Sequence, residues 1–307
     1  MAQTATAEAA RRPRFGRTTR RALLGYAFIS PWLIGFLCFT LGPILAVFYF
    51  SFSQYSIFSA PHLIGLQNYL KAFTGDRLFP VALLNTLYYV GVAVPLDLLG
   101  GFALALALNA RLRGITVFRT LFYIPAIVPT VAATIVFVWL FDPNLGLINY
   151  VLSLGGINGP NWLGSAIWAK PAIVLLSLWH VGGSMIIYLA GLQGIPEHLY
   201  EAAAIDGANR WEKLLHVTVP LMTPTILYNA VIGVIGSFQV FATAYIATGG
   251  GPRNATLFFV LYIYQKAFQD FSLGYASALA WILFLLILVF TLVLFRSSRS
   301  WVHYEGA

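Results

Sequence analysis

Six long apolar runs constrain this chain more than any other feature of its sequence. A helix that crosses a lipid bilayer needs about 20 predominantly apolar residues, and the chain is 59% hydrophobic, more than soluble domains usually are. The sequence therefore predicts an all-α integral membrane protein with six transmembrane helices. The runs occupy residues 23–52, 80–109, 120–141, 171–192, 222–246 and 274–295.

The distribution of basic residues predicts which ends of the helices face the cytoplasm. Most of the 18 lysines and arginines lie before the first run, between the second and third runs, near residue 210 and after the last run. Basic residues favour the cytoplasmic side, so we expect both termini and the stretch around residue 210 there. The net charge of +8 then reflects membrane topology and attraction to anionic lipid, and no nucleic-acid partner is expected.

Three parts of unequal length follow from this pattern. We expect residues 1–22 to form a basic, disordered cytoplasmic tail, residues 23–295 to form the six-span domain, and residues 296–307 to form a short cytoplasmic tail. The external connections are too short for folded domains, but "GLQNYLKAF" after residue 64 predicts a short interfacial helix.

Sequence motifs for chemistry are few. The chain lacks the G-x-x-x-x-G-K-[ST] phosphate loop, a Ser/His/Asp set and metal-ligand spacing. We therefore expect no enzyme activity, no cofactor and no metal site in this chain. A charged residue midway along a span costs about 2.5–3.5 kcal/mol unless it faces other helices. Asp97 lies midway along the second run, and we favour an interhelical hydrogen bond for it. His180 in the fourth run raises the same question. If these two residues carried protons or ions, the chain would be a proton- or ion-coupled secondary transporter, which we keep as the alternative function.

The stretch "EAAAIDGANRWEKLLHVTVP", residues 201–220, carries five charged residues in a chain that is 9% charged. The pattern predicts a short helix that begins near Pro196 and stops at Gly207, where a positive φ is expected. Asn209 is expected to cap a second helix, which should end before Pro220. Ala202 and Ala203 would let a partner approach the backbone closely. A plain amphipathic loop is the alternative.

The spacing of Glu201, Ala202, Ala203, Gly207 and Pro220 closely resembles the EAA loop of the membrane subunits of bacterial ABC importers. The stretch departs from that pattern conservatively, with valines where Ile and Leu are usual and Leu214 where Phe is common. The resemblance implies a cytoplasmic coupling-helix loop over residues 195–220 that docks on an ATPase, with Glu201 paired to a basic residue there. The implied coupling residues are Glu201, Ala202, Ala203, Asp206, Gly207 and Pro220.

Three other segments are similar to the carbohydrate branch of this family, the maltose and glycerol-phosphate type. They are "YIPAIVPTVAATIVFVWLFDPNLGLIN" from residue 123, "TGGGPRNATLFFVLYIYQKAF" from residue 248 and "LGYASALAWILF" from residue 273. The resemblance implies a type I permease fold in the bacterial inner membrane, forming half of a pore for a sugar, oligosaccharide or glycerol-phosphate-like solute. It implies a heterodimer with a second six-span permease, an extracytoplasmic solute-binding protein, and two copies of an ATPase subunit that carry the ATP and Mg.

Candidate residues for the solute pathway lie near the outer end of the fifth run. Sugars stack on aromatic rings and bond to amides and hydroxyls, which Gln239, Phe241 and Tyr245 supply. His180 is added as a polar residue of the fourth run. Gln239 and Tyr245 are six residues apart, so not all of these residues would line one wall of a continuous helix. Ordinary membrane-interface aromatics are the alternative.

Overall fold

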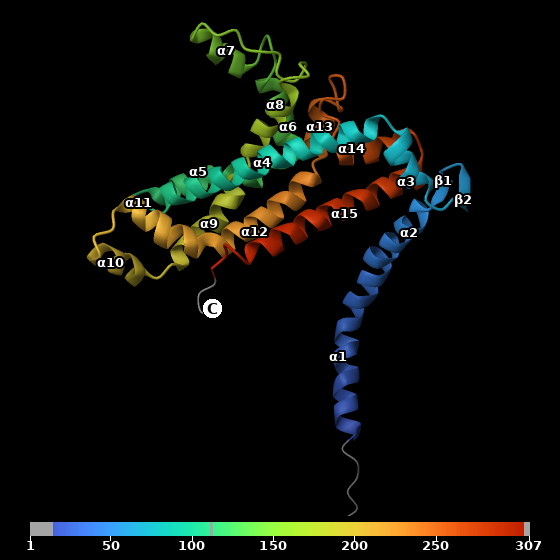
Figure 1. Cartoon of the computed structure of the whole chain (residues 1–307), viewed down its shortest axis with the longest axis horizontal. Coiled ribbons are helices and arrows are strands. Elements are labelled where there is room, and N and C mark those ends of the chain that lie inside the picture. The colour runs from blue at the N-terminus through green and yellow to red at the C-terminus, as the bar shows by residue number, and fades with distance from the viewer. Residues whose placement is uncertain (1–14, 111–112, 304–307) are drawn as a thin grey trace, which may run out of the picture. The chain divides into compact units, whose positions relative to one another are not determined.

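The computed structural model describes residues 15–110 and 113–303, which divide into one unit up to Tyr49 and a second from Phe50 (Figure 1). The first unit contains α1 (Phe15–Phe36), a π-helical turn (Leu37–Leu41) and most of α2 (Gly42–Ser51), whose last two residues belong to the second unit. Together they supply an apolar helix over Leu24–Ser51 that is long enough to span a bilayer. Helix α1 includes residues 15–22 of the predicted basic tail, and the rest of that tail lies outside the described residues.

The second unit begins with a β-hairpin, an addition to the predicted helices. Strands β1 (Ser53–Ser56) and β2 (Ser59–Leu63) are antiparallel. The predicted interfacial helix follows as α3 (Gln67–Leu70) and a π-helical turn (Lys71–Gly75). The buried amide of Asn68 donates to the carbonyl oxygens of Ser51 and Ser53 at 3.0 and 2.9 Å. These hydrogen bonds hold α3 against the start of the hairpin.

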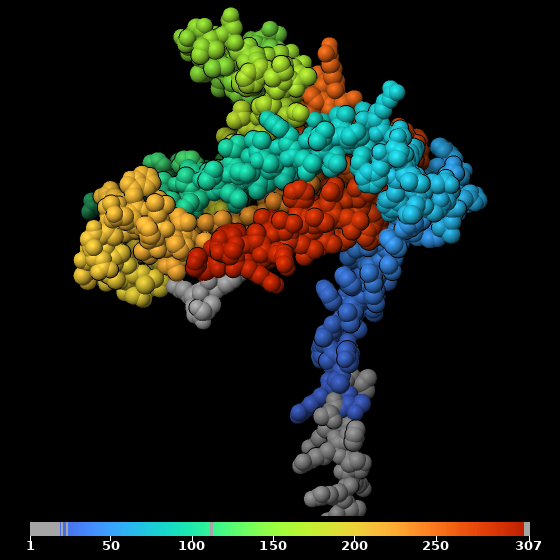
Figure 2. Space-filling model, viewed as in Figure 1, coloured from blue at the N-terminus to red at the C-terminus, as the bar shows by residue number. Residues whose placement is uncertain are grey.

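Three long helices form the main body of the second unit. Helix α4 (Leu78–Leu108), the continuous helix Arg210–Phe238 and α15 (Leu273–Ser298) are all long and apolar enough to cross a membrane. The α12 part (Val219–Phe238) packs against both α4 and α15. Figure 2 shows α4 and α15 along one face of the unit. Both helices carry exposed leucines, such as Leu99 and Leu292, as expected for lipid-facing surfaces.

Two of the six predicted spans are bent helix pairs, and the sequence analysis did not predict these breaks. Helices α5 (Ile115–Ile127) and α6 (Thr130–Leu140) meet at 97°, and α8 (Ala169–Leu178) and α9 (Gly182–Gly194) meet at 43°. Pro129 explains the first break, because the residue before a proline favours extended backbone and Val128 has ψ 130°. With each pair counted as one span, the described residues contain six candidate spans.

The fifth span ends earlier than its apolar run. Helix α12 stops at Phe238, whereas the run predicted a span to Ile246, and a separate short helix α13 (Ala242–Ala247) follows. Phe238 is fully buried and packs on Phe290, while Phe241 has non-helical backbone. Apolar composition predicted the length of this segment but not where its helix is interrupted.

The remaining helices are α7 (Leu147–Leu154), α10 (Glu197–Ile205), α11 (Arg210–Lys213) and α14 (Phe259–Tyr264), with π-helical turns at Leu214–Thr218 and Gln265–Gln269.

Buried polar side chains of α4 fix the long connection before α14. The Asn85 amide donates to the carbonyl oxygens of Asn254 and Leu257 at 2.8 and 3.2 Å. The hydroxyl of Thr86 accepts the N–H of Phe259 at 2.8 Å. These hydrogen bonds therefore tie the connection to the first part of α4.

Candidate functional site

The charged stretch at residues 201–220 forms a sharp elbow between α10 and α11. Gly207 has φ +82°, as predicted from its position between two helices. The Asn209 side chain accepts the N–H groups of Trp211 and Glu212 at 2.9 and 3.0 Å. The Glu212 carboxylate in turn accepts the N–H of Asn209 at 2.6 Å. This reciprocal capping box fixes the start of α11, and the predictions for the backbone at Gly207 and for the Asn209 cap are confirmed.

The second arm of the elbow does not end before Pro220, so that prediction was wrong. Helix α11 passes through the π-helical turn Leu214–Thr218 directly into α12, with the N–H of Val219 bonded to the carbonyl of Leu214. In a regular α-helix, the ring of Pro220 would clash with the carbonyl of residue 216. The wider π-turn rearranges the preceding carbonyls. The elbow and the fifth span are therefore one continuous helix.

The outer surface of the elbow combines charge, small side chains and large apolar side chains. Glu201, Ala202 and Asp206 are exposed, whereas Ala203 is half-buried. Ile205 and Trp211 are 87% and 73% exposed. The sequence analysis missed these two residues, although a large apolar side chain in a short charged stretch is itself a signal of a docking surface. An open cavity of about 430 Å³ borders the elbow, and its lining includes Ala203, Asp206, Gly207, Glu212 and His216.

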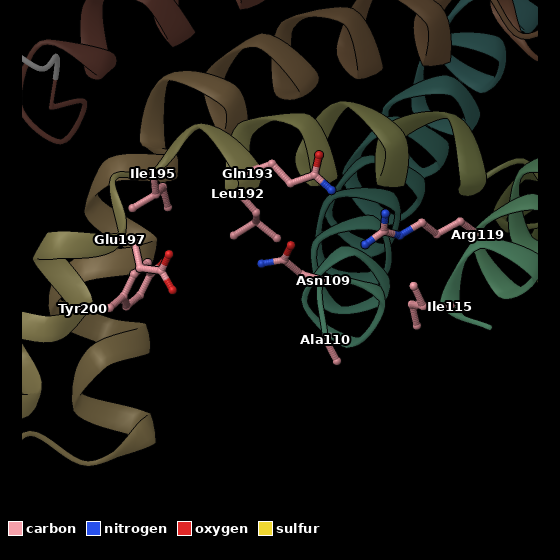
Figure 3. Close-up of a pocket in the computed structure, with 9 residues that line it drawn as sticks. All are labelled: Asn109, Ala110, Ile115, Arg119, Leu192, Gln193, Ile195, Glu197 and Tyr200. Atoms are coloured by element: carbon pink, nitrogen blue, oxygen red, sulfur yellow. The ribbon is translucent and has the colours of Figure 1, made fainter. Parts of the chain in front are cut away.

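A larger polar cavity of about 720 Å³ lies at the base of the elbow (Figure 3). Arg119 of α5 donates to the carbonyl oxygen of Leu108, the last residue of α4, from Nε at 3.1 Å and from Nη2 at 2.9 Å. This contact satisfies an otherwise unpaired carbonyl at the C-terminus of α4. Glu197 and Tyr200 bring α10 to the same cavity. The elbow thus adjoins the joint between α4 and α5. The cavity is lined by Asn109, Ala110, Ile115, Arg119, Leu192, Gln193, Ile195, Glu197 and Tyr200.

Asp97 lies inside the bundle, as the cost of burying its charge predicts. The Ser184 hydroxyl of α9 donates to Asp97 Oδ1 at 3.2 Å, which confirms the predicted interhelical hydrogen bond. Asp97 also borders a cavity of about 220 Å³ between α4, α8 and α12, lined by Tyr89, Ala93, Val94, Asp97, Ser177, Ile232, Gly233, Gly236 and Ser237. Sequence reasoning missed the hydroxyls of this cavity because they come from three separate spans.

The candidate pathway residues occupy two places in the fold. Phe241 and Tyr245 stack with ring centroids 5.5 Å apart, and Tyr264 of α14 packs against both rings. Gln239 is exposed in the interruption between α12 and α13. His180 lies in a different interruption, between α8 and α9, and its Nε2 is buried without a hydrogen-bond partner among the described residues. The aromatic pair is therefore part of a local cluster, while His180 belongs to another element.

Potential metal ligands do not gather within residues 15–110 and 113–303: no group of three His, Cys, Asp or Glu side chains there could hold a metal ion. The charged and polar side chains of the candidate site serve instead as caps, as helix-to-helix hydrogen bonds and as exposed surface.

A bundle of apolar spans with a charged elbow at one end and polar cavities between the helices defines a multi-span membrane transport component. Residues 98–301 match the family described as "Binding-protein-dependent transport system inner membrane component", and the chain belongs to this family. This membership confirms the resemblance drawn from the EAA spacing, together with an inner-membrane, multi-pass location. The relatives are permease proteins of transport systems and not enzymes.

Relatives match over nearly the whole chain. The probable ABC transporter permease protein YesP of Bacillus subtilis is 45% identical over 92% of this chain and 93% of its own. The trehalose/maltose transport system permease protein MalF of Thermococcus litoralis is 36% identical over 91% and 95%. A chain in the crystal structure of a bacterial ABC transporter that imports the acidic polysaccharide alginate superposes with a TM-score of 0.83 at 26% identity, over 94% of this chain and 99% of that one. These matches confirm the type I permease fold.

Proposed function

We propose that this chain forms half of the transmembrane pore of an ATP-driven carbohydrate importer, and that its elbow couples the pore to an ATPase subunit. The observation that carries the proposal is the continuous helix from Arg210 to Phe238. Because one helix contains both an arm of the elbow and a membrane span, a force applied to the elbow moves that span directly.

The exposed surface of the elbow has the composition of a docking surface. Large apolar side chains that are exposed in a free subunit act as anchors when a partner buries them. Ile205 and Trp211 are such side chains. Glu201 is exposed on the same helix as Ile205, and we assign it an ion pair with a basic residue of the ATPase. Ala202 and Ala203 leave the backbone of α10 open to close approach, while Asp206, Gly207 and Pro220 shape the elbow.

The proposed assembly contains a second six-span permease, two copies of an ATPase subunit that bind ATP and Mg, and an extracytoplasmic solute-binding protein. Support comes from a solved relative, an alginate ABC transporter in complex with an alginate pentasaccharide-bound periplasmic protein. We place the elbow and both termini in the cytoplasm on the basis of the basic residues. The N–H of His303 donates to the Thr223 hydroxyl at 2.9 Å, so the C-terminal segment lies near the elbow end of α12.

The proposed solute is a carbohydrate or polyol phosphate. Relatives over about nine-tenths of the chain include permeases named for arabinooligosaccharides in Bacillus subtilis and for sn-glycerol-3-phosphate in Yersinia pestis. The stacked rings of Phe241 and Tyr245 supply the apolar faces on which sugars pack. We propose these rings, the nearby Gln239 and the buried imidazole of His180 as pathway groups. Family membership favours this ATP-driven function over a secondary transporter that uses Asp97 and His180.

The test is uptake of labelled oligosaccharides by proteoliposomes that contain this chain with its partner permease, ATPase and binding protein. We expect uptake only with ATP on the ATPase side and with the binding protein on the other side. A protonophore should leave uptake unchanged. Uptake by this chain without the ATPase, driven by a proton gradient, would overturn the proposal in favour of the secondary transporter.

A further inference from the structure

The inner face of α10 is attached to the fifth span by a short chain of hydroxyl groups. The hydroxyl oxygens of Tyr200 and Thr218 lie 3.0 Å apart. Thr218 Oγ1 also donates to the carbonyl oxygen of Lys213 at 3.3 Å. A threonine hydroxyl has one proton, so once that proton is donated to Lys213, Tyr200 must be the donor to Thr218. The bonds therefore run in one direction, from Tyr200 to Thr218 to the backbone of Lys213.

The position of Thr218 makes this link mechanically relevant. Thr218 is 5% exposed and is the last residue of the π-helical turn that joins α11 to α12. Tyr200 is half-buried on α10 and borders the 720 Å³ cavity on its other side (Figure 3). The Tyr200 hydroxyl is thus hydrogen-bonded to Thr218, while the residue also borders the cavity that adjoins α4 and α5.

The covalent route between the same two elements is weaker as a transmitter. It passes through Gly207, whose positive φ and exposed position place few side-chain restraints on the turn. A turn of this kind can absorb a displacement of α10 by changes in its backbone angles. The hydrogen bond from Tyr200 to Thr218 connects α10 directly to the start of α12, so the two arms of the elbow are joined by this bond as well as by the turn.

We infer that Tyr200 and Thr218 are a positioning pair that makes the span α12 follow the movement of α10. The inference rests on the proposed function and deepens it, because it names the contact by which the elbow drives the pore. The pair acts after docking: the ATPase still binds the outer surface of α10 when the pair is lost. Losing the pair should therefore uncouple ATP hydrolysis from transport without releasing the ATPase.

The experiment measures uptake and ATP hydrolysis in the same proteoliposomes for Tyr200→Phe, Thr218→Val and Thr218→Ser. One lost hydrogen bond predicts an increase of about three- to tenfold in ATP consumed per solute imported for Tyr200→Phe and Thr218→Val. Thr218→Ser retains the hydroxyl and should stay near the wild-type ratio. The double variant Tyr200→Phe/Thr218→Val should be no worse than either single variant, because both remove the same link.

The control is Tyr228→Phe, a ring hydroxyl deletion on α12 at an exposed position; it should leave the ratio unchanged. The inference about the pair would be overturned if Tyr200→Phe left the ATP consumed per solute imported unchanged, or if the double variant added the effects of the two single variants. If instead the elbow does not dock the ATPase, so that the proposed function is wrong, Glu201→Lys should leave both ATPase recovery and uptake intact. If Glu201→Lys releases the ATPase while Tyr200→Phe transports with normal coupling, the pair alone is refuted.

Discussion

The Ser184 hydroxyl on α9 lies 3.2 Å from Oδ1 of Asp97 on α4, in a half-buried contact between the two helices, and 2.9 Å from the carbonyl oxygen of Val181 on its own segment. The two helices are able to approach because Gly101 faces Ser184: a Cβ at residue 101 would lie 2.4 Å from the serine hydroxyl oxygen. A small residue on one helix therefore makes room for a polar contact from the other, as is common between membrane helices.

Asp97→Asn tests the role of that contact. The amide keeps the size of the side chain and an acceptor oxygen for Ser184. We therefore expect normal membrane levels, and uptake of labelled oligosaccharide into proteoliposomes within about twofold of wild type. Asp97→Leu removes the acceptor and should lower the melting temperature of the purified protein, since one buried hydrogen bond contributes about 1 kcal/mol. Loss of uptake in Asp97→Asn at normal expression would instead show that the carboxylate acts on the solute.

Glu201→Lys tests docking of the ATPase. The substitution puts a repulsive charge where an acidic partner is proposed, so the chain should insert normally but recover little ATPase in a pull-down. Glu201→Gln, which removes the charge without reversing it, should be intermediate. Full recovery together with wild-type uptake would remove Glu201 from the coupling surface.

Gly207→Val tests the backbone of the elbow. A Cβ at Gly207 would meet no atom within 4 Å, so space is not limiting and the cost comes from φ +82° alone. Left-handed backbone costs an L-residue about 1–2 kcal/mol, and a β-branched residue more. We expect Gly207→Val to lose ATPase association and uptake, with Gly207→Ala milder.

Gly91→Ala is the matched control for the elbow variants. Gly91 lies within α4, has ordinary helical φ, and a Cβ there would also meet no atom within 4 Å. It should behave as wild type. Wild-type transport by Gly207→Val would contradict the requirement for left-handed backbone at residue 207.

Trp211→Ala tests the apolar part of the docking surface. Trp211 is 73% exposed, so its removal should cost the free subunit little stability. If the ATPase buries it as an anchor, affinity should fall at least about 30-fold, which corresponds to roughly 2 kcal/mol. Ile57→Ala, at an exposed position in the hairpin connection, is the control. Equal affinities measured for the two variants would argue against Trp211 as an anchor.

Asp76 predicts a pH dependence of stability. Burial raises the pKa of this carboxyl, but hydrogen bonds from the hydroxyls of Tyr262 and Tyr275 and from the backbone N–H groups of Leu78 and Phe79 outweigh it and lower the pKa below its ordinary value of 3.8. A carboxyl with a lowered pKa stabilises the folded state above its ordinary pKa, and this contribution is lost as the pH falls through the lowered value.

The measurement is the melting temperature of wild type and Asp76→Asn between about pH 6 and pH 2.5. We expect the variant to melt lower at pH 6 and the difference to shrink below about pH 4. Two lysines also lie over the two tyrosine rings: Lys71 Nζ is 4.6 Å from the ring centroid of Tyr275 and Lys266 Nζ is 5.3 Å from that of Tyr262, with Lys266 paired to Asp270. A difference that stays constant with pH would refute the role of the ionised carboxyl.

Local signals in the sequence determined the membrane class, the elbow and the family. The apolar runs predicted spanning segments because length and composition decide whether a helix is stable in lipid. Gly207 and Asn209 predicted the turn and the cap because both effects act within about three residues of the chain. The spacing from Glu201 to Pro220 indicated the family for the same reason: its residues lie on one short segment.

Contacts between distant segments were decided only by the tertiary structure. Apolar runs in a membrane protein are hydrophobic on all sides, so their periodicity does not show which face meets which neighbour. The bond from Ser184 to Asp97, the Arg119 contact at the end of α4 and the link from Tyr200 to Thr218 therefore required the packed helices. The continuity of the elbow with the fifth span likewise depended on the π-turn before Pro220, because a proline signals a helix break unless the surrounding backbone rearranges to accommodate its ring.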